Sequence, residues 1–464
     1  MSVRGPLGAT PNSASVELGR SAALGRGETF GASRRGPIGL AGLLICGALI
    51  SLAAANTTPL LPESIRPVPT ALAGAFSSLG LNLHAGGTMA ILVLNLVCYL
   101  VVVANSRHLT ARTVLTVIAA LYAFILLAPP LISTDIFSYQ AYSRMGAVYG
   151  FNPYLIGPHG IAFDPLSMYI GAKWSYIPSV YGPLFTALSY ALAPLSIAAS
   201  AIAYKSVAVV SALAIVAMVW NIARLRGVDP VKAVAIVGLN PLLALYGVGG
   251  GHNDLLMLVP LVGAVYAVVL GRDRLGGGLT LAAVGIKLTA GLVLPFALAA
   301  GGPLRDRTRR VNLLLGSAVG FTALAALGLA LFGTGILNMF PTVEQSQAKG
   351  DWHSLPGLIV TLGASTAGHA IGILFTAVFV VVTIRLLRKV WHGQMDWVAG
   401  AAWATLALLL SANSLLPWYV SWLLPLTALC ADRRLVRATL ALTCFVQVVQ
   451  FPGYIPHAAA MIGH

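Results

Sequence analysis

The chain has too few charged residues to form the surface of a soluble domain. Asp, Glu, Lys and Arg make up 9% of its 464 residues, 58% are hydrophobic, and the mean hydropathy is +0.86. So few polar side chains could not cover a globular surface in water. We therefore expect a polytopic membrane protein.

Cysteine is scarce, and nucleic-acid motifs are absent from the sequence. The four cysteines, Cys46, Cys98, Cys430 and Cys444, all lie in apolar runs, a pattern that suggests packing residues, with neither a disulfide framework nor a metal cluster. The net charge of +15 comes without a basic-aromatic patch, so we attribute it to membrane orientation and contact with anionic lipids. We expect no metal, no cofactor and no nucleic-acid partner.

Apolar runs of the roughly 20 residues that cross a bilayer are frequent. They begin near residues 37, 87, 111, 200, 231, 253, 312, 367, 397, 416 and 435. A further apolar stretch, 279–300, is interrupted by Lys287, where we expect two short or tilted spans to meet. The sequence thus predicts an all-α membrane protein with about 13 transmembrane helices.

The ends of the chain differ from its middle. Residues 1–35 are rich in Gly, Ser, Ala and Arg, which predicts a disordered, basic cytoplasmic tail. We expect a single transmembrane domain over 36–455, with outer loops at 133–199 and 334–366. Residues 456–464 would form a short tail on the outer face.

The basic residues predict the orientation. If the N-terminus is cytoplasmic and 182–197 is an interfacial helix, 22 of the 28 Lys and Arg residues lie inside, as the positive-inside rule requires. The six outside are Arg66, Arg144, Lys173, Lys205, Lys287 and Lys349. The outer side then also holds Glu63, Asp135, Asp164, Asp254, Glu344 and Asp351. We therefore expect an active site on the extracytoplasmic face of the plasma membrane.

Asp135 follows a long apolar run directly, at the predicted membrane boundary. A carboxylate there could act as a general base and take a proton from an acceptor hydroxyl. Alternatively, Ser133, Thr134 or Asp135 merely caps a helix that continues through Tyr139 to Arg144. The sequence leaves both interpretations open.

A glycine-rich turn, 247–251, leads into three polar residues, His252, Asn253 and Asp254. Glycines let the backbone approach a ligand closely, and polar groups at a helix start can bind a sugar or a phosphate. The alternative is a tight turn between spans in which Asn253 or Asp254 is the N-cap.

Lys287 and two aromatic segments complete the candidates. A lysine in an apolar stretch is costly unless it reaches water or an anion, which suggests a lipid-linked phosphate; the alternative is snorkelling to the interface. His353 lies in a polar loop, 341–356, that suits sugar hydroxyls but also fits a hydrated loop with an interfacial Trp. Trp418 could contact substrate or belong to an aromatic belt.

Taken in order, these segments resemble one known family. The order is Asp135-Ile136-Phe137-Ser138-Tyr139, Gly150-Phe151-Asn152-Pro153-Tyr154, Tyr181-Gly182-Pro183, Asn240-Pro241, Gly249-Gly250-Gly251-His252-Asn253-Asp254, Lys287 and Pro417-Trp418-Tyr419. It resembles the polyprenol-phosphomannose-dependent α-1,6-mannosyltransferases of actinobacteria, members of the GT-C superfamily of membrane glycosyltransferases. The resemblance covers roughly residues 87 to 430.

The resemblance implies an inverting enzyme that moves mannose from polyprenyl-phosphate-mannose to a lipid-linked mannoside acceptor, without a nucleotide sugar or a metal. It implies that Asp135 is the catalytic base and that Lys287 lies near the donor phosphate. The residues expected to orient sugar hydroxyls are Tyr139, Asn152, Tyr154, His252, Asn253 and Asp254. Alternates for phosphate contact are Arg144, Lys205 and His353, and Trp418 is a further substrate contact. Transfer of arabinose or glucose, or a lipid or solute transporter, are the alternatives.

Overall fold

A computed structural model describes residues 34–56, 58–66, 69–300, 307–348, 351–363 and 365–454. Every regular element within these ranges is a helix, which confirms the predicted all-α class. The chain divides into Met1–Arg34 and Arg35–His464, and the fold below is that of the second unit. The predicted tails, 1–35 and 456–464, lie outside the described residues except for Arg34 and Arg35.

Six helical regions are long and apolar enough to cross a membrane. They contain α1 (Arg35–Ala53), α2 (His84–Ala104), α6 (Ile197–Leu225), α12 (Arg307–Phe332), α15 (Gly368–Trp391) and α18 (Arg433–Val449). A seventh candidate is α7 (Pro230–Gly238) with the π-helix Leu242–Val248, a pair bent by 46°. The protein is thus a multi-pass membrane protein.

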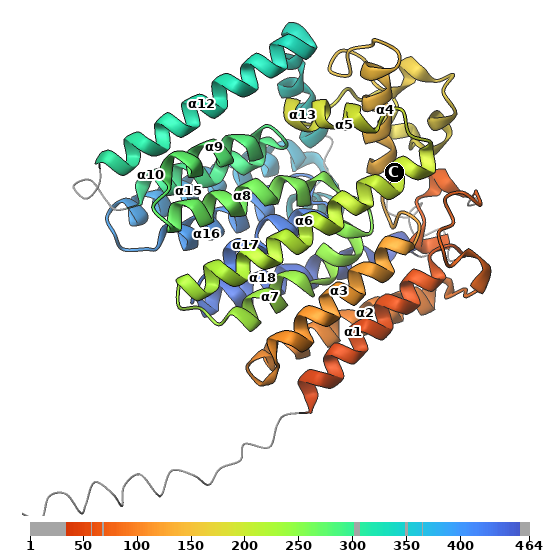
Figure 1. The fold of residues 1–464 in the computed structure, drawn as a ribbon, viewed down its shortest axis with the longest axis horizontal. Coiled ribbons are helices and arrows are strands. Elements are labelled where there is room, and N and C mark those ends of the chain that lie inside the picture. The colour runs from red at the N-terminus through yellow and green to blue at the C-terminus, as the bar shows by residue number, and fades with distance from the viewer. Residues whose placement is uncertain are drawn as a thin grey trace, which may run out of the picture. The chain divides into compact units, whose positions relative to one another are not determined.

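The remaining helices are shorter than a typical span. They are α3 (Ala111–Leu127), α4 (Asp135–Ala147), α5 (Pro183–Ser189), α8 (Asn253–Val269), α9 (Asp273–Val284), α10 (Val293–Ala299), α13 (Met339–Ala348), α14 (Leu355–Thr361), α16 (Trp397–Ser411) and α17 (Leu424–Ala428). Figure 1 shows α1, α2 and α3 packed together, α6 beside α8, and α9 between α8 and α12. The number of about 13 spans stays a prediction, because several expected spans are short or broken helices.

The predicted helix break at Lys287 is confirmed, and a second break lies at Asn240-Pro241. Asn240 ends the α7 segment, and its side-chain oxygen accepts the amides of Leu242 and Leu243, at 2.9 and 3.3 Å. Lys287 lies between α9 and the 3₁₀-helix Leu288–Leu292 that leads into α10. Each break therefore has a polar side chain at its centre.

The break at Lys287 is joined to the start of α5. The amide of Gly182 donates to the carbonyl of Ile286 at 3.0 Å, and that of Leu184 donates to Gly285 at 2.9 Å. A Cβ at position 182 would collide with the backbone of Gly285. Gly182 thus allows the two irregular backbones to pair and satisfy each other's polar groups.

Asp164 organises the loop between α4 and α5. It is 1% exposed and accepts Nε–H of Arg144 at 2.8 Å, the hydroxyl of Tyr149 at 2.6 Å and the amide of Leu166 at 2.9 Å. Burial favours the protonated form, but the bonds from Tyr149, Leu166 and Arg144 outweigh it and lower the pKa of Asp164 below its usual value.

We expect Asp164→Asn to destabilise the protein by about 2 kcal/mol at pH 7, because hydrogen bonds to an ionised group are lost. The folded-state pKa is the lower one, so the wild-type carboxylate stabilises fully above the unfolded pKa of about 3.9. This contribution is lost as the pH falls through the folded pKa. The difference in apparent melting temperature between wild type and variant should therefore be large at pH 7 and shrink below about pH 4.

Asp229→Asn is the matched control for this melting experiment. Asp229 is the N-cap of α7 and accepts the amides of Val231 and Lys232. Asn caps a helix as well as Asp, so this variant should melt as the wild type does. Equal melting of Asp164→Asn and wild type at pH 7 would contradict the role of Asp164.

Candidate active site

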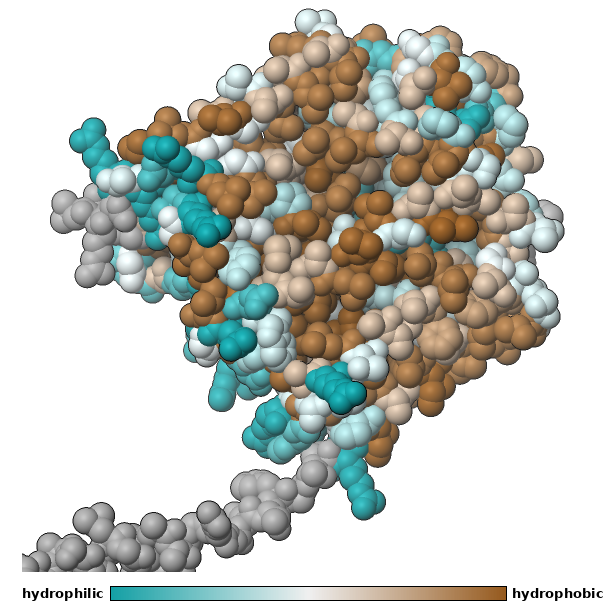
Figure 2. All heavy atoms as spheres, viewed as in Figure 1, coloured by the Kyte–Doolittle hydropathy of each residue, from teal (hydrophilic) through white to brown (hydrophobic). Residues whose placement is uncertain are grey.

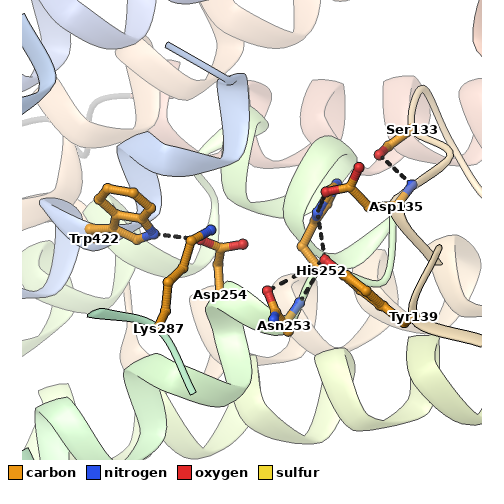
Figure 3. A network of polar contacts seen from close by, with 8 residues as sticks. All are labelled: Ser133, Asp135, Tyr139, His252, Asn253, Asp254, Lys287 and Trp422. Carbon is orange, nitrogen blue, oxygen red and sulfur yellow. Dashed lines mark hydrogen bonds and ion pairs between the residues drawn. The ribbon is translucent and has the colours of Figure 1, made fainter. Parts of the chain in front are cut away.

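Two helices begin at one polar cluster. Asp135 is the first residue of α4, and its Oδ2 lies 3.5 Å from Nδ1 of His252, which directly precedes α8. The hydroxyl of Tyr139 lies 3.4 Å from both Nδ1 of His252 and Oδ1 of Asn253. Figure 3 shows these side chains directed toward one another from the two helix starts. The structure thus brings the predicted Asp135 loop and glycine-rich turn into one site.

The start of α4 leaves the Asp135 carboxylate available. The hydroxyl of Ser133 accepts the amide of Asp135 at 3.2 Å, whereas Thr134, at the N-cap position, makes no side-chain cap bond. The side chain of Asp135 is 20% exposed. Capping therefore falls to Ser133, and the carboxylate lies at a helix N-terminus, where negative charge is favourable.

Two glycines before His252 lie where any larger residue would be in close contact with the site. A Cβ at Gly250 would lie 2.6 Å from Nε2 of His252. Gly251 has φ of +64°, and a Cβ there would lie 2.8 Å from Cδ1 of Ile136 in α4. A left-handed backbone in such close contact requires glycine.

The alternative in which Asn253 or Asp254 is the N-cap of α8 is wrong. His252 occupies the N-cap position without a side-chain cap bond, and Asn253 and Asp254 are the first two helical residues. Their side chains are thus not used to start the helix.

Buried polar atoms in the cluster lack partners. Among the described residues, those without a hydrogen-bond partner include Nε2 of His252, Nδ2 of Asn253 and Oδ2 of Asp254. Buried polar groups are nearly always hydrogen-bonded, because leaving one unpaired costs about 1–3 kcal/mol. Three such atoms on consecutive residues indicate a site for a ligand rich in hydroxyl or phosphate groups.

Asp254 and Lys287 form an ion pair next to this site. Nζ of Lys287 lies 2.6 Å from Oδ1 of Asp254, and Nε1 of Trp422 donates to the same oxygen at 2.6 Å. The ammonium also lies 4.5 Å from the ring centre of Tyr419 and 5.0 Å from that of Trp422. The ammonium is therefore held within the protein by a carboxylate and two aromatic faces, and the snorkelling alternative is wrong.

The aromatic residues after Pro417 line the same site. The ring of Trp418 stacks on His252 at 3.6 Å between centroids, and Trp418 and Trp422 are each only 6% exposed. They are thus not a lipid-facing belt. Of these residues only Trp418 was predicted as a substrate contact; Tyr419 and Trp422 join the site as well, and their place beside Trp418 in one short segment is the signal for them.

The other four predicted residues make their polar contacts elsewhere. Arg144 pairs with Asp164, and His353 pairs with Asp351. Asn152 donates to the carbonyl of Phe332 at 2.7 Å, and the hydroxyl of Tyr154 donates to the carbonyl of Tyr181 at 2.9 Å. Their roles in substrate binding stay predictions.

Tyr154 reaches the site indirectly. The ring of Tyr181 packs edge-on against Tyr139, with centroids 5.0 Å apart. Tyr154 therefore fixes Tyr181, and Tyr181 in turn supports the residue that contacts His252 and Asn253.

Lys205 fixes the backbone before Asp135. Its ammonium is buried and donates to the carbonyls of Ile125 at 2.7 Å, Ala128, and Pro129 at 3.1 Å. These carbonyls end α3, where a cation is favourable. All three N–H groups are used, so the predicted alternate role of Lys205 in phosphate contact is wrong.

Comparisons with known proteins agree on one family. The chain matches the model of the alpha-(1->6)-mannopyranosyltransferase N-terminal domain over residues 34–301 and that of the MptB C-terminal domain over residues 347–456. Alpha-(1->6)-mannopyranosyltransferase A of Mycobacterium tuberculosis is 30% identical over 362 residues, 70% of this chain and 68% of that protein. No solved structure matches the chain.

Two further relatives match a similar share of the chain. A probable alpha-(1->6)-mannopyranosyltransferase of Mycolicibacterium smegmatis is 27% identical, over 70% of this chain and 66% of that protein. Alpha-(1->6)-mannopyranosyltransferase B of Corynebacterium glutamicum is 28% identical, over 67% of this chain and 57% of that protein. The chain thus spans about two thirds, or less, of the length of these two relatives.

We expect Lys205→Met to lower the apparent melting temperature, with a loss of about 2–5 kcal/mol, because three buried carbonyls lose their donor. Amide hydrogen exchange over residues 125–135 should become faster, since the end of α3 is no longer fixed. Lys389→Met, at an exposed position near the end of α15, is the control and should change neither quantity. Unchanged melting and exchange in Lys205→Met would contradict this anchoring role.

Proposed function

The chain belongs to the alpha-(1->6)-mannopyranosyltransferase family and is a membrane glycosyltransferase, and from this premise we propose that it transfers mannose from polyprenyl-phosphate-mannose to a lipid-linked mannoside of the lipomannan type. The transfer forms α-1,6 linkages with inversion on the outer face of the plasma membrane. The proposed architecture is of the GT-C type with about 13 spans. The observation that carries the proposal is the convergence of Asp135 with the unpaired polar atoms of His252, Asn253 and Asp254.

Asp135 is the proposed general base. The acceptor hydroxyl oxygen bonds to the anomeric carbon of mannose while the bond from that carbon to the phosphate oxygen breaks. The hydroxyl proton passes to Asp135, and polyprenyl phosphate leaves with the electron pair. The partial exposure of Asp135 and its place at the start of α4 suit an ionised carboxylate that an acceptor can reach.

His252 is proposed to contact both Asp135, the proposed base, and the mannose. Its Nδ1 faces Asp135 and Tyr139, and its ring is held against Trp418, so its orientation is fixed. Its Nε2 is buried and unpaired and would bond a mannose hydroxyl. Nδ2 of Asn253 and Oδ2 of Asp254 add one donor and one acceptor for neighbouring hydroxyls.

Lys287 is the proposed partner of the donor phosphate. Negative charge grows on the phosphate as the sugar departs, and a positioned ammonium stabilises it. Oδ1 of Asp254 holds the ammonium in place before the donor arrives. Asp254 thus has two proposed roles: Oδ1 holds Lys287 and Trp422, and Oδ2 would bond the sugar.

The course of α6 supports the proposed orientation. α6 begins after the loop that carries Gly182 and ends at Leu225, next to Arg226. Arg224 lies in the last turn of α6, and Arg226, which pairs with Asp396 at 2.7 Å, directly follows the helix, so two arginines lie at that end. Arginine-rich ends of membrane helices usually face the cytoplasm, which supports the proposed outer location of the opposite end.

We expect Asp135→Asn to lower transfer by a factor of about 10²–10⁴, because the variant keeps the shape of the side chain but cannot accept the proton. Membranes with each variant are incubated with radiolabelled polyprenyl-phosphomannose and a short α-mannoside acceptor. Asp229→Asn is the control and should retain full activity. Near-normal turnover by folded Asp135→Asn would rule out the base; transfer only from polyprenyl-phosphate arabinose or glucose would rule out mannose.

We expect Lys287→Met to raise the apparent KM for the donor and to reduce transfer by at least about tenfold, since an ionic contact to phosphate is lost. It should also destabilise the protein, because the buried Asp254 loses its ion-pair partner. The double variant Lys287→Met, Asp254→Asn should recover melting temperature but not transfer. Lys287→Arg should retain more transfer than Lys287→Met. Recovery of transfer together with stability in the double variant would show that Lys287 has only a structural role.

A further inference from the structure

A cavity lies apart from the polar site, between α10, α12 and α15. Its volume is about 530 Å³. Its apolar wall is formed by Pro295 and Leu298 of α10, Leu314 of α12, and Ile384 and Leu387 of α15. A volume of this size lies within the range of about 300–1,000 Å³ that pockets for small molecules have.

The same cavity has positive charge on one side. Arg310, in the first turn of α12, and Arg388, in the last turn of α15, both line it. The guanidinium carbon of Arg310 lies 5.0 Å from the ring centre of Trp391, which also lines the cavity. None of its nine described lining residues is acidic. The cavity thus has a long apolar wall, and two arginines are among the residues at one end of it.

The cavity faces the lipid. α15 contributes no buried residue to its apolar window, and Ile384 is 45% exposed. Figure 2 shows hydrophilic side chains gathered at the end of the molecule where α12 begins, next to a broad hydrophobic band. An occupant from the bilayer can therefore enter with its tail on the apolar wall and its head at this boundary.

We propose that this cavity binds one anionic phospholipid, with an acyl chain along α10, α12 and α15 and the phosphate against Arg310 and Arg388. A guanidinium binds phosphate oxygens in a bidentate manner, which an ammonium cannot do. Basic pockets between transmembrane helices at the cytoplasmic surface bind anionic head groups. On the proposed topology, the arginine-rich end lies at that surface.

This site is distinct from the proposed donor site. The chain from Lys287 to Ala299 runs through a 3₁₀-helix of five residues and a helix of seven. The nine lining residues of the cavity include neither Lys287 nor the three residues that contact its ammonium, Asp254, Tyr419 and Trp422. The occupant is therefore a lipid of the leaflet at the arginine-rich end, and the inference does not depend on the proposed reaction.

Native mass spectrometry of the purified full chain tests the proposal, with dioleoyl phosphatidylglycerol and dioleoyl phosphatidylcholine added in equal amounts. We expect the wild type to retain one phosphatidylglycerol at least tenfold more strongly than phosphatidylcholine. The double variant Arg310→Gln, Arg388→Gln should lose this preference. Arg385→Gln, a neighbouring exposed arginine of α15 that does not line the cavity, should keep it.

Two further measurements distinguish binding of the acyl chain in the cavity from attraction to surface charge. Leu387→Trp fills the cavity and keeps both arginines, so it should also weaken retention at least tenfold. Glycerol 3-phosphate in excess should not displace the lipid, because it lacks the acyl chain. An equal loss in Arg385→Gln, full retention in Leu387→Trp, or displacement by glycerol 3-phosphate would each overturn the proposal.

Discussion

One carboxylate oxygen joins three segments that are far apart in the sequence. Oδ1 of Asp254, at the start of α8, accepts both Lys287 from the break before α10 and Trp422 from the 3₁₀-helix Pro417–Trp422. Removing two charges from water is costly, and the cost is offset only where the geometry is good and further contacts are made. Here the indole N–H and the aromatic faces of Tyr419 and Trp422 supply those contacts. The three segments must meet at this oxygen, which fixes their positions on one side of the candidate site.

The same constraint explains why the site is built from irregular backbone. In a bilayer, a helix can be interrupted only where other groups satisfy its freed amides and carbonyls. Lys205 does this at the end of α3, Asn240 does it before the π-helix, and Gly182 pairs the start of α5 with the break at Lys287. Each interruption therefore has its own polar support. Breaks that would be unfavourable alone are thus tolerated together.

Much of this could be predicted from the sequence, since the local signals are strong. Low charge and long apolar runs predict the all-α membrane class, Pro241 and Lys287 mark two breaks, and the polar residues after Gly251 mark the site. What failed depended on tertiary contacts. Lys205 and Lys287 are each a lone lysine in an apolar stretch, so the sequence does not distinguish them. In the structure Lys205 donates to backbone carbonyls, whereas Lys287 contacts a carboxylate and two aromatic rings. The role of Trp422 could not be predicted, because its partner Asp254 is remote in sequence.

The polar side chains that begin several helices contrast with those of the candidate site. At the arginine-rich end, Asp229, Asp396 and Asp432 each accept first-turn amides, so their charge is used to begin helices. At the other end, three consecutive residues after Gly251 each keep one buried polar atom unpaired. Because these unpaired atoms lie beside Asp135, a stacked histidine and a held ammonium, they support the proposal that a substrate completes this site.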